Sequence, residues 1–480
     1  MVANVVELAA SDVQVADLHR VFKAQKQAYR QHPMPSADER IAHLTSLRRV
    51  LVKYQNELAQ AVSDDFGHRS QDETKFAEIM TSLEGIKYYL KNVRKWMRPS
   101  KRHVSAMQMP ATARVYYQPL GVVGVIVPWN YPIFLASGPL MCALAAGNRV
   151  MIKMSGFTPR VSEMVKKMLA EVFAEDHVAV FTGRGEISEA FSKLAFDLLT
   201  FTGSTNVGRT VMAEAAKNLT PVLLELGGKS PAVVHDSYPL ESAAERIAFG
   251  KCWNAGQTCV APDYLMLPPG KTQPFVDAFT AQVSKMYPTM LNNPDFTSII
   301  NDKQYKRVQG YLDDARAQGA KVIEINPAGE TFTDTRKMPV TLVTGVTPAM
   351  QIMQNEIFAP VLAVMEYATL DDALKFINDR PRPLALYYFD WNSSRGEYVT
   401  NNTHSGGMCI NETVSHVGID DMPFGGVGAS GMGKYHGHEG FLAMSNAKGV
   451  LEKPKFYSVR YFLPPFNKGI HKFVKNYILK

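Results

Sequence analysis

Three side chains in this 480-residue sequence have the types needed for acyl chemistry through a thioester. Cys259 ends the segment Asn-Ala-Gly-Gln-Thr-Cys, Glu225 lies in Leu-Leu-Glu-Leu-Gly-Gly, and Asn130 lies in Pro-Trp-Asn-Tyr-Pro. A thiolate is a nucleophile, a buried carboxylate is a general base, and a side-chain amide can donate to an oxyanion. Each residue lies at a predicted strand end or domain junction, so the fold can bring them together.

Each residue alone also has a structural interpretation. A free cysteine is most often a buried, inert thiol, Glu225 could be a partnered structural charge, and Asn130 could form an Asx turn. The other cysteines, Cys142, Cys252 and Cys409, keep the structural interpretation. Four cysteines without a CxxC pair do not indicate a disulfide scaffold, so we expect a reducing, cytoplasmic location. The N-terminus also lacks the pattern of a signal peptide.

Two glycine-rich segments are candidates for a phosphate-binding turn. Residues 201–208, Phe-Thr-Gly-Ser-Thr-Asn-Val-Gly, follow a predicted strand and open a predicted helix, where backbone N–H groups and the helix dipole favour an anion. A plain strand-to-helix turn capped by Ser204 fits the same pattern. Residues 426–431 match the GxGxxG string, but they lie in a loop without the strand and helix of a dinucleotide site. We therefore interpret them as a flexible or tightly turned loop.

The surrounding pattern predicts the elements that position these residues. Apolar residues recur at helical spacing over residues 12–99. Short apolar segments then alternate with helices up to residue 226, which predicts a doubly wound, Rossmann-like α/β domain with a buried parallel sheet. A second alternation after Cys259 predicts a second α/β domain, with an interdomain cleft at the junction. The strands are predicted at 121–127, 149–153, 178–181, 197–201 and 222–226, then at 263–267, 321–325, 341–345, 361–366, 384–389 and 406–410.

The net charge of +7 belongs almost entirely to the C-terminal end. Residues 455–480 contain six Lys or Arg and no Asp or Glu, which leaves about +1 (7 − 6) for the rest of the chain. A field that attracts polyanions is not indicated, so no nucleic-acid partner is expected. After Pro464-Pro465 the apolar residues fall on one helical face, which predicts a short basic amphipathic helix. We favour packing of this helix on the body or on a partner subunit over contact with an anionic membrane surface.

The uncharged segment 115–148 is long enough to imitate a membrane span. Four prolines, at positions 119, 128, 132 and 139, interrupt it. We therefore predict a buried strand, a loop and a buried helix rather than a transmembrane helix.

The motifs taken together resemble the aldehyde dehydrogenase superfamily over about residues 15–450. The matching segments, in the order of the family, are PWNYP (128–132), FTGS (201–204), LELGGKSP (224–231), NAGQTC (254–259), NEIFAP (355–360) and MPFGGVGASGMG (422–433). The APDY at 261–264 and the YHG at 435–437 resemble the branch with class 3 and fatty aldehyde dehydrogenases. The whole chain is most similar to the coniferyl aldehyde dehydrogenases of that neighbourhood.

The resemblance implies a role for each site residue. Cys259 would attack the aldehyde to give a thiohemiacetal, and Asn130 with the Cys259 backbone N–H would hold the oxyanion. Hydride transfer would leave a thioester, which water activated by Glu225 would hydrolyse. The implied cofactor-binding residues are Lys153 at the adenosine ribose, Gly203 and Ser204 near the pyrophosphate, Trp129, Glu356 at the nicotinamide ribose, and Phe358 beside it. No metal is implied.

The implied cofactor is NAD or NADP. The family usually continues the cofactor lysine with Pro-Ser-Glu, whereas this sequence reads Lys153-Met-Ser-Gly156. Loss of the carboxylate removes its repulsion of a 2′-phosphate, so we hypothesise that both cofactors are accepted.

The resemblance also implies the domain division and the partners. N-terminal helices would occupy residues 1–110, the NAD(P)-binding domain 111–226, the catalytic domain 227–420, a return to the cofactor domain with an oligomerisation strand 421–454, and the tail 455–480. A homodimer acting on a small-molecule aldehyde is expected, first an aromatic coniferyl- or cinnamyl-type aldehyde and second a medium- or long-chain one. Glu225 argues against a coenzyme A-acylating relative, and the retained trio argues against a non-catalytic one.

Overall fold

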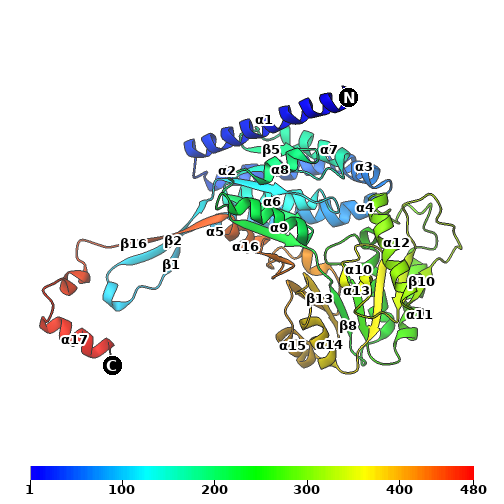
Figure 1. The fold of residues 1–480 in the computed structure, drawn as a ribbon. Helices are drawn as coiled ribbons and strands as arrows, with labels where there is room; N and C mark the ends of the chain where they lie inside the picture. The colour runs from blue at the N-terminus through cyan, green and yellow to red at the C-terminus, as the bar shows by residue number, and fades with distance from the viewer. Residues whose placement is uncertain (1, 480) are drawn as a thin grey trace.

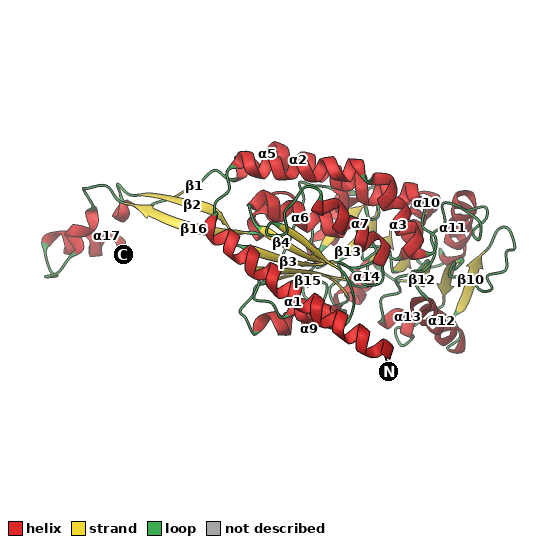
Figure 2. Cartoon of the chain, turned by 90° about the horizontal axis from the view of Figure 1, so that it is seen from above, coloured by secondary structure: helices red, strands yellow, loops and turns green. Residues whose placement is uncertain are grey.

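Two open α/β sheets meet at a cleft, and a smaller sheet projects from one side of the molecule (Figures 1 and 2). This computed structural model describes residues 2–479, with side chains from residue 13 onward. The N-terminal layer is helical, as predicted, and Ser36 forms a capping box with Glu39 at the start of the second helix. Its elements are α1 (Val2–Gln31), α2 (Ala37–Lys53), α3 (Gln55–Phe66), α4 (Gln71–Thr74), the π-helix η1 (Lys75–Met80) and α5 (Thr81–Trp96).

The first sheet has the strand order β15-β7-β6-β3-β4-β5, and its strands are parallel except for β15. Its strands are β3 (Val122–Ile126), β4 (Arg149–Lys153), β5 (Val178–Phe181), β6 (Leu198–Gly203), β7 (Val222–Leu226) and β15 (Gly431–Met432). Its helices are α6 (Phe134–Ala146), α7 (Pro159–Ala170), α8 (Glu186–Ser192) and α9 (Thr205–Ala216). The strand order reverses beside β3 and β6, and open α/β sheets bind ligands at such a switch point.

The second sheet has the order β10-β11-β12-β9-β8-β13-β14, with only β10 antiparallel to its described neighbour. Its strands are β8 (Pro231–Val234), β9 (Tyr264–Leu267), β10 (Lys321–Ile325), β11 (Val340–Thr344), β12 (Val361–Glu366), β13 (Ala385–Phe389) and β14 (Gly407–Ile410). Its helices are α10 (Leu240–Cys252), α11 (Thr272–Met286), α12 (Asp302–Ala317), α13 (Gln351–Gln354), α14 (Leu370–Asn378) and α15 (Ser393–Asn402). The six predicted strands are confirmed, and β8 with α10 were not predicted.

The projecting sheet has the order β1-β2-β16 and is antiparallel. Its strands are β1 (Ser100–Arg102), β2 (Thr112–Pro119) and β16 (Ser445–Glu452), and β2 pairs with β16 from Thr112 to Pro119. The predicted boundary at residue 111 assigned β2 to the cofactor domain, whereas its pairing places it in this extension. The partner strand lies near the other end of the sequence, so no local pattern could reveal it.

The C-terminal tail lies at the far end of this extension, away from the two large sheets (Figures 1 and 2). The predicted amphipathic helix is confirmed as α17 (Gly469–Ile478), which follows the short helix η5 (Ser458–Phe462). Its apolar side chains are exposed, with Phe473 at 67% and Tyr477 at 80%. Packing of the tail on the body of its own chain is therefore wrong for the residues that the structure describes.

The uncharged segment 115–148 forms the end of β2, then β3, a loop and α6, as predicted. Every side chain of α6 is buried, which explains the absence of charge. Among residues 2–479, no helix combines the length and the hydropathy needed to cross a membrane.

Candidate active site

A cleft of about 910 Å³ lies where the two large sheets meet, and we refer to it as the Cys259 cleft. The carboxyl ends of β3, β6 and β7 supply one wall, and the loop between α10 and β9 supplies Cys259. The predicted site residues that line it are Trp129, Asn130, Gly203, Ser204, Glu225, Cys259, Glu356 and Phe358. Sequence segments more than a hundred residues apart therefore converge on one cavity.

The loop before Cys259 has a tightly constrained backbone. Asn254 and Ala255 have left-handed φ angles of 51° and 50°, and Gly256 has φ 68°. A Cβ on Gly256 would lie 2.2 Å from the carbonyl oxygen of Ala359, so only glycine fits there. Non-glycine residues persist in this conformation only where their surroundings hold them, and such strain gathers at functional sites.

The Cys259 thiol is half-buried in the cleft and lies near the carboxyl groups of Glu356 and Glu225. Burial raises its pKa to about 12, and the nearby carboxylates of Glu356 and Glu225 contribute to the rise. A thiol with this pKa carries its proton at neutral pH. A positive charge brought into the cleft would favour the thiolate.

Glu225 is buried in β7 opposite Gly431 of β15. Within residues 2–479, neither of its carboxylate oxygens meets the geometry of a hydrogen bond. Burial raises the pKa of Glu225 well above its ordinary value, while the Lys434 ammonium and the Gly426 N–H act in the opposite direction. Lys434 does not pair with it, because its Nζ donates to the carbonyl oxygens of Gly406 and Gly425. Within residues 2–479, the Glu225 carboxylate therefore lacks the ion-pair or hydrogen-bond partner that a purely structural charge would have.

The glycine-rich loop at 422–433 lies directly against Glu225 and its strand. A Cβ on Gly425 would lie 2.7 Å from Glu225 Oε1, and a Cβ on Gly431 would lie 2.1 Å from the Leu224 carbonyl oxygen. The glycines permit this close approach of backbone to strand. The interpretation of residues 426–431 as a tightly turned loop is confirmed, since Gly428 and Gly431 form an antiparallel bridge.

Asn130 faces the loop that precedes Cys259. Its Nδ2 donates to the Gln257 carbonyl oxygen at 3.2 Å. Its own carbonyl oxygen accepts from Arg69 Nη1 at 2.9 Å and from Asn254 Nδ2 at 3.0 Å. The Asn130 side chain is thus tied to the cysteine loop rather than to its own turn.

Glu356, Phe358 and Ser204 line the cleft away from Cys259's own loop, and one of them has an altered pKa. Burial raises the pKa of Glu356 to about 8, and its Oε1 accepts from the Gly228 N–H at 3.3 Å. Phe358 packs edge-on against Trp129, with ring centroids 5.4 Å apart. Ser204 is the N-cap residue of α9, yet its side chain makes no capping hydrogen bond, contrary to the alternative of a plain capped turn.

Lys153 is the predicted residue that does not line the Cys259 cleft. It lies at the carboxyl end of β4, where its buried Nζ donates to the carbonyl oxygens of Met154 and Gly183 at 2.8 and 2.7 Å. Burial lowers the pKa of Lys153 to about 8. These two bonds use two of the three N–H donors of the ammonium, so one donor remains for a ribose hydroxyl.

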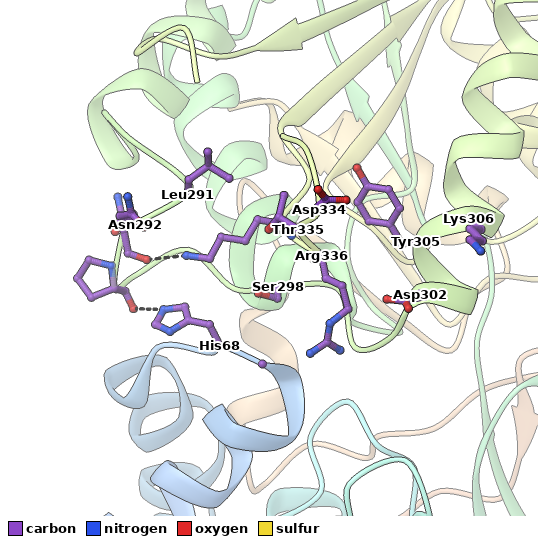
Figure 3. A pocket seen from close by; sticks show the side chains of 14 residues that line it. His68, Leu291, Asn292, Ser298, Asp302, Tyr305, Lys306, Asp334, Thr335 and Arg336 are labelled. Atoms are coloured by element: carbon purple, nitrogen blue, oxygen red, sulfur yellow. Dashed lines mark hydrogen bonds between the residues drawn. The ribbon is translucent and has the colours of Figure 1, made fainter. Parts of the chain in front are cut away.

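A second hollow of about 910 Å³, which we refer to as the His68 hollow, lies between residues 67–68 and the loops at 291–302 and 334–337 (Figure 3). Lys337 Nζ donates to the carbonyl oxygens of Met290 and Asn293 at 3.1 and 3.0 Å. Arg336 donates to the Ile300 carbonyl, and His68 Nε2 lies 3.0 Å from the Pro294 carbonyl oxygen. None of the predicted site residues lines this hollow.

Sequence reasoning missed two groups of residues near Cys259. Phe424 and Tyr435 line the cleft, and both lie in or beside the quoted motifs at 422–433 and 435–437. Arg69, Glu73 and Glu78 are buried charges behind it. No local signal distinguished the second group, because the polar segment 69–78 also contains the charged residues Asp72 and Lys75.

Comparison with known proteins agrees with this geometry. The model of the aldehyde dehydrogenase family matches residues 4–450. A probable coniferyl aldehyde dehydrogenase of Pseudomonas aeruginosa is 53% identical over 99% of both chains, and a coniferyl aldehyde dehydrogenase of a Pseudomonas species is 42% identical over 98% of both. The substrate-bound structure of Staphylococcus aureus AldH has a TM-score of 0.90 at 34% identity, covering 96% of this chain and 99% of that one.

Proposed function

The chain belongs to the aldehyde dehydrogenase family, and on that premise we propose that it oxidises a coniferyl-type aromatic aldehyde to the carboxylic acid in the Cys259 cleft. It is an oxidoreductase that uses a nicotinamide cofactor. The observation that carries the proposed site is the meeting of a thiol and an unpaired buried carboxylate in one cleft. The two groups are the nucleophile and the general base that oxidation through a thioester requires.

Cys259 forms the first covalent bond. Its thiolate sulfur bonds to the carbonyl carbon, the carbonyl π pair moves to oxygen, and a thiohemiacetal oxyanion results. The Asn130 amide, which lies against the cysteine loop, and the Cys259 N–H donate to that oxyanion. The chemistry that a bound nicotinamide would supply at this point is acceptance of the hydride from this carbon. A thioester to Cys259 remains.

Glu225 releases the product. A water attacks the thioester carbon, the Glu225 carboxylate takes a proton from that water, and the C–S bond breaks to free the carboxylic acid and the Cys259 thiolate. A buried carboxylate with a raised pKa is a stronger base than an exposed one, which suits this step near neutral pH. Phe424 and Tyr435 give the cleft an aromatic wall that fits an aromatic substrate.

The residues present fit a dinucleotide cofactor. Gly203 ends β6, and Ser204 is the N-cap residue of α9. Because no side chain caps α9, its first turn leaves backbone N–H donors for a pyrophosphate. Glu356 and Phe358 would hold the nicotinamide ribose beside Trp129, and Lys153 would bind the adenosine ribose. These roles follow the family motif and the lining of the cleft.

Acceptance of both NAD and NADP is part of the proposal. Gly156 stands where the family carries glutamate, and a Cβ there would lie 2.0 Å from Arg184 Cγ. Arg184 Nε donates to the Gly156 carbonyl oxygen. A guanidinium beside this loop attracts a 2′-phosphate where a carboxylate would repel it. Steady-state comparison tests this, and a preference for NAD above about a thousand-fold, roughly 4 kcal/mol, contradicts it.

A homodimer in the cytoplasm is also proposed. The edge strand β16 and the helix α17 expose apolar side chains, including Leu451, Phe473 and Tyr477, on an extension away from the body. Exposed apolar surface of this kind marks an association site. Sedimentation of the full chain against a 1–454 truncation tests whether the tail packs on the partner.

The direct test of the proposed function is NAD(P)H release with coniferyl-type and aliphatic aldehydes, with and without coenzyme A. We expect the highest kcat/KM with aromatic aldehydes and the free acid as product without coenzyme A. A requirement for coenzyme A, or a consistent preference for aliphatic aldehydes, contradicts the proposal.

A further inference from the structure

A buried cluster of three charged residues joins the N-terminal helices to the loops of the Cys259 cleft. We refer to Arg69, Glu73 and Glu78 as the Arg69 cluster. The Arg69 side chain is 0% exposed, its Nη1 donates to Glu78 Oε1 at 3.0 Å, and its Nε lies 3.9 Å from Glu73 Oε1. The mechanism above assigns no step to these residues.

Each member of the Arg69 cluster bonds to a different part of the site. Arg69 Nη1 donates to the carbonyl oxygen of Asn130 at 2.9 Å. Glu78 Oε2 accepts from the N–H groups of Ile133 and Phe134 at 2.7 and 3.0 Å, which fixes the loop after Asn130. The cluster therefore holds both ends of the segment that presents the oxyanion amide.

Glu73 extends the cluster to the cysteine loop. Its Oε1 accepts from the backbone N–H of Asn254, the first of the residues with left-handed φ. Asn254 Nδ2 in turn donates to the carbonyl oxygens of Asn130 and Gln257, both at 3.0 Å. A strained turn keeps its shape only where such contacts over-determine it. Asn130 and the cysteine loop are thus held by one continuous network.

The local fold supports this arrangement. Glu73 and Glu78 are five residues apart, and the π-helix η1 between α4 and α5 has i→i+5 geometry, which lets both carboxylates face one guanidinium. Replacing a buried ion pair with apolar residues is often neutral for stability, while removing one partner is destabilising. Stability alone therefore does not account for three buried charges at this place.

We propose that Arg69 is a positioning residue that holds the Asn130 amide and the Cys259 loop in the geometry of the oxyanion site. The inference rests on the proposed function, because it concerns the step in which the aldehyde oxygen becomes negative. A displacement near 1 Å at a reacting centre lowers rates by about a hundred-fold, so the expected loss is large.

Arg69→Lys tests the proposal, with Arg69→Met as a second variant. Lysine keeps the positive charge of the cluster, but its single ammonium cannot reproduce the guanidinium fork. We expect kcat for aldehyde oxidation to fall by about 10- to 100-fold. The KM for the aldehyde and the Kd for NAD should change by less than about threefold, because neither depends mainly on the oxyanion contact.

Alkylation of Cys259 by iodoacetamide separates a positioning role of Arg69 from a merely structural one, because structural damage would slow alkylation and oxidation together. Alkylation needs the thiolate but no oxyanion site, so its rate should stay within about threefold of wild type in Arg69→Lys. Equal losses in alkylation and oxidation would indicate general distortion and overturn the proposal. An unchanged kcat would also overturn it.

Arg40→Met is the matched control. Arg40 is another arginine with 0% exposure, and it donates to the carbonyl oxygens of Pro35, Ala145 and Ala146, away from the cleft. We expect a lower Tm and an unchanged kcat per alkylatable site. An equal loss of kcat in this control would show that any buried arginine has the same effect. Absence of aldehyde oxidation in the wild-type enzyme would instead contradict the proposed function itself.

Discussion

The Cys259 cleft and the His68 hollow have the same volume, about 910 Å³, but their polar groups are in different states. In the His68 hollow, the cations Lys337 and Arg336 donate to backbone carbonyls. In the Cys259 cleft, the oxygens of Glu225 have no hydrogen-bond partner in the described chain, and the pKa of Cys259 is raised.

The difference teaches that cavity size does not identify a reactive site. A buried polar group without a partner costs free energy, so its presence in a cleft points to chemistry. A perturbed pKa alone does not separate the two cavities, because burial also lowers the pKa of Lys337 in the His68 hollow to about 8. Paired groups in a hollow of equal size hold loops together. Removing the nucleophile of the Cys259 cleft should therefore lower activity, whereas removing a paired cation of the His68 hollow should lower stability.

Cys259→Ala should give the largest effect. Loss of a catalytic nucleophile lowers turnover by more than about 10⁴-fold, and we expect that loss here with NAD binding retained. Tryptophan fluorescence measures the binding, since Trp129 lines the cleft. Cys252→Ala, at a buried neighbouring thiol, is the control and should keep turnover within about threefold. Substantial aldehyde oxidation by Cys259→Ala would show that Cys259 is not the nucleophile.

The pH dependence of Cys259 alkylation should be the next largest effect. A thiol pKa near 12 means that the thiolate fraction rises tenfold per pH unit below that value. Alkylation of the cofactor-free enzyme should therefore rise about a hundred-fold from pH 7 to pH 9. Mass spectrometry of the Cys259 peptide measures it. Bound NAD, with its positive ring, should shift the curve to lower pH. A plateau below pH 9 without NAD would contradict the raised pKa of Cys259.

Lys337→Met should lower stability without affecting the reaction. It removes the donor to the Met290 and Asn293 carbonyls, and an unsatisfied buried acceptor costs about 1–3 kcal/mol. We expect Tm to fall by about 2–5 °C and kcat/KM to remain within about twofold. Thermal melts and steady-state assays measure both. A loss of activity at unchanged Tm would give the His68 hollow a functional role.

Glu225→Gln should produce the smallest effect, a rise in Tm where Lys337→Met lowers it. The pKa of Glu225 is raised in the fold, so the stability associated with its proton is present at low pH and decreases as pH rises above the unfolded value of about 4.5. Glutamine removes this dependence. The variant should melt about 1–3 °C above wild type at pH 8, with a smaller difference at pH 5. A lower Tm at pH 8 would show that the carboxylate is stabilised in the fold.

The sequence predicted the two large sheets because their strands are continuous apolar segments whose period is local. The strand predicted at 361–366 coincides with β12, and the buried helix predicted within the segment 115–148 is α6. The trio of Cys259, Glu225 and Asn130 could be named because each lies in a short motif at a strand end or at the domain junction.

Other features depend on contacts that local patterns do not contain. The pairing of β2 with β16 joins distant parts of the chain, and the bonds of Lys153 to Gly183 depend on how two loops pack. The exposure of α17 could not be inferred from an amphipathic pattern, because that pattern fits a covered face equally well. The Arg69 cluster follows from a π-helix that the apolar periodicity did not indicate.

The most direct test of the central claim is a rapid-quench single turnover of Glu225→Gln with an aromatic aldehyde and NAD. We expect one equivalent of NADH in a burst, followed by turnover slowed by about 10²- to 10⁴-fold. Mass spectrometry should then find the acyl group on the Cys259 peptide. Steady turnover at the wild-type rate, or an acyl group on any other cysteine, would contradict the assignment of Cys259 as nucleophile and Glu225 as the base that releases the acid.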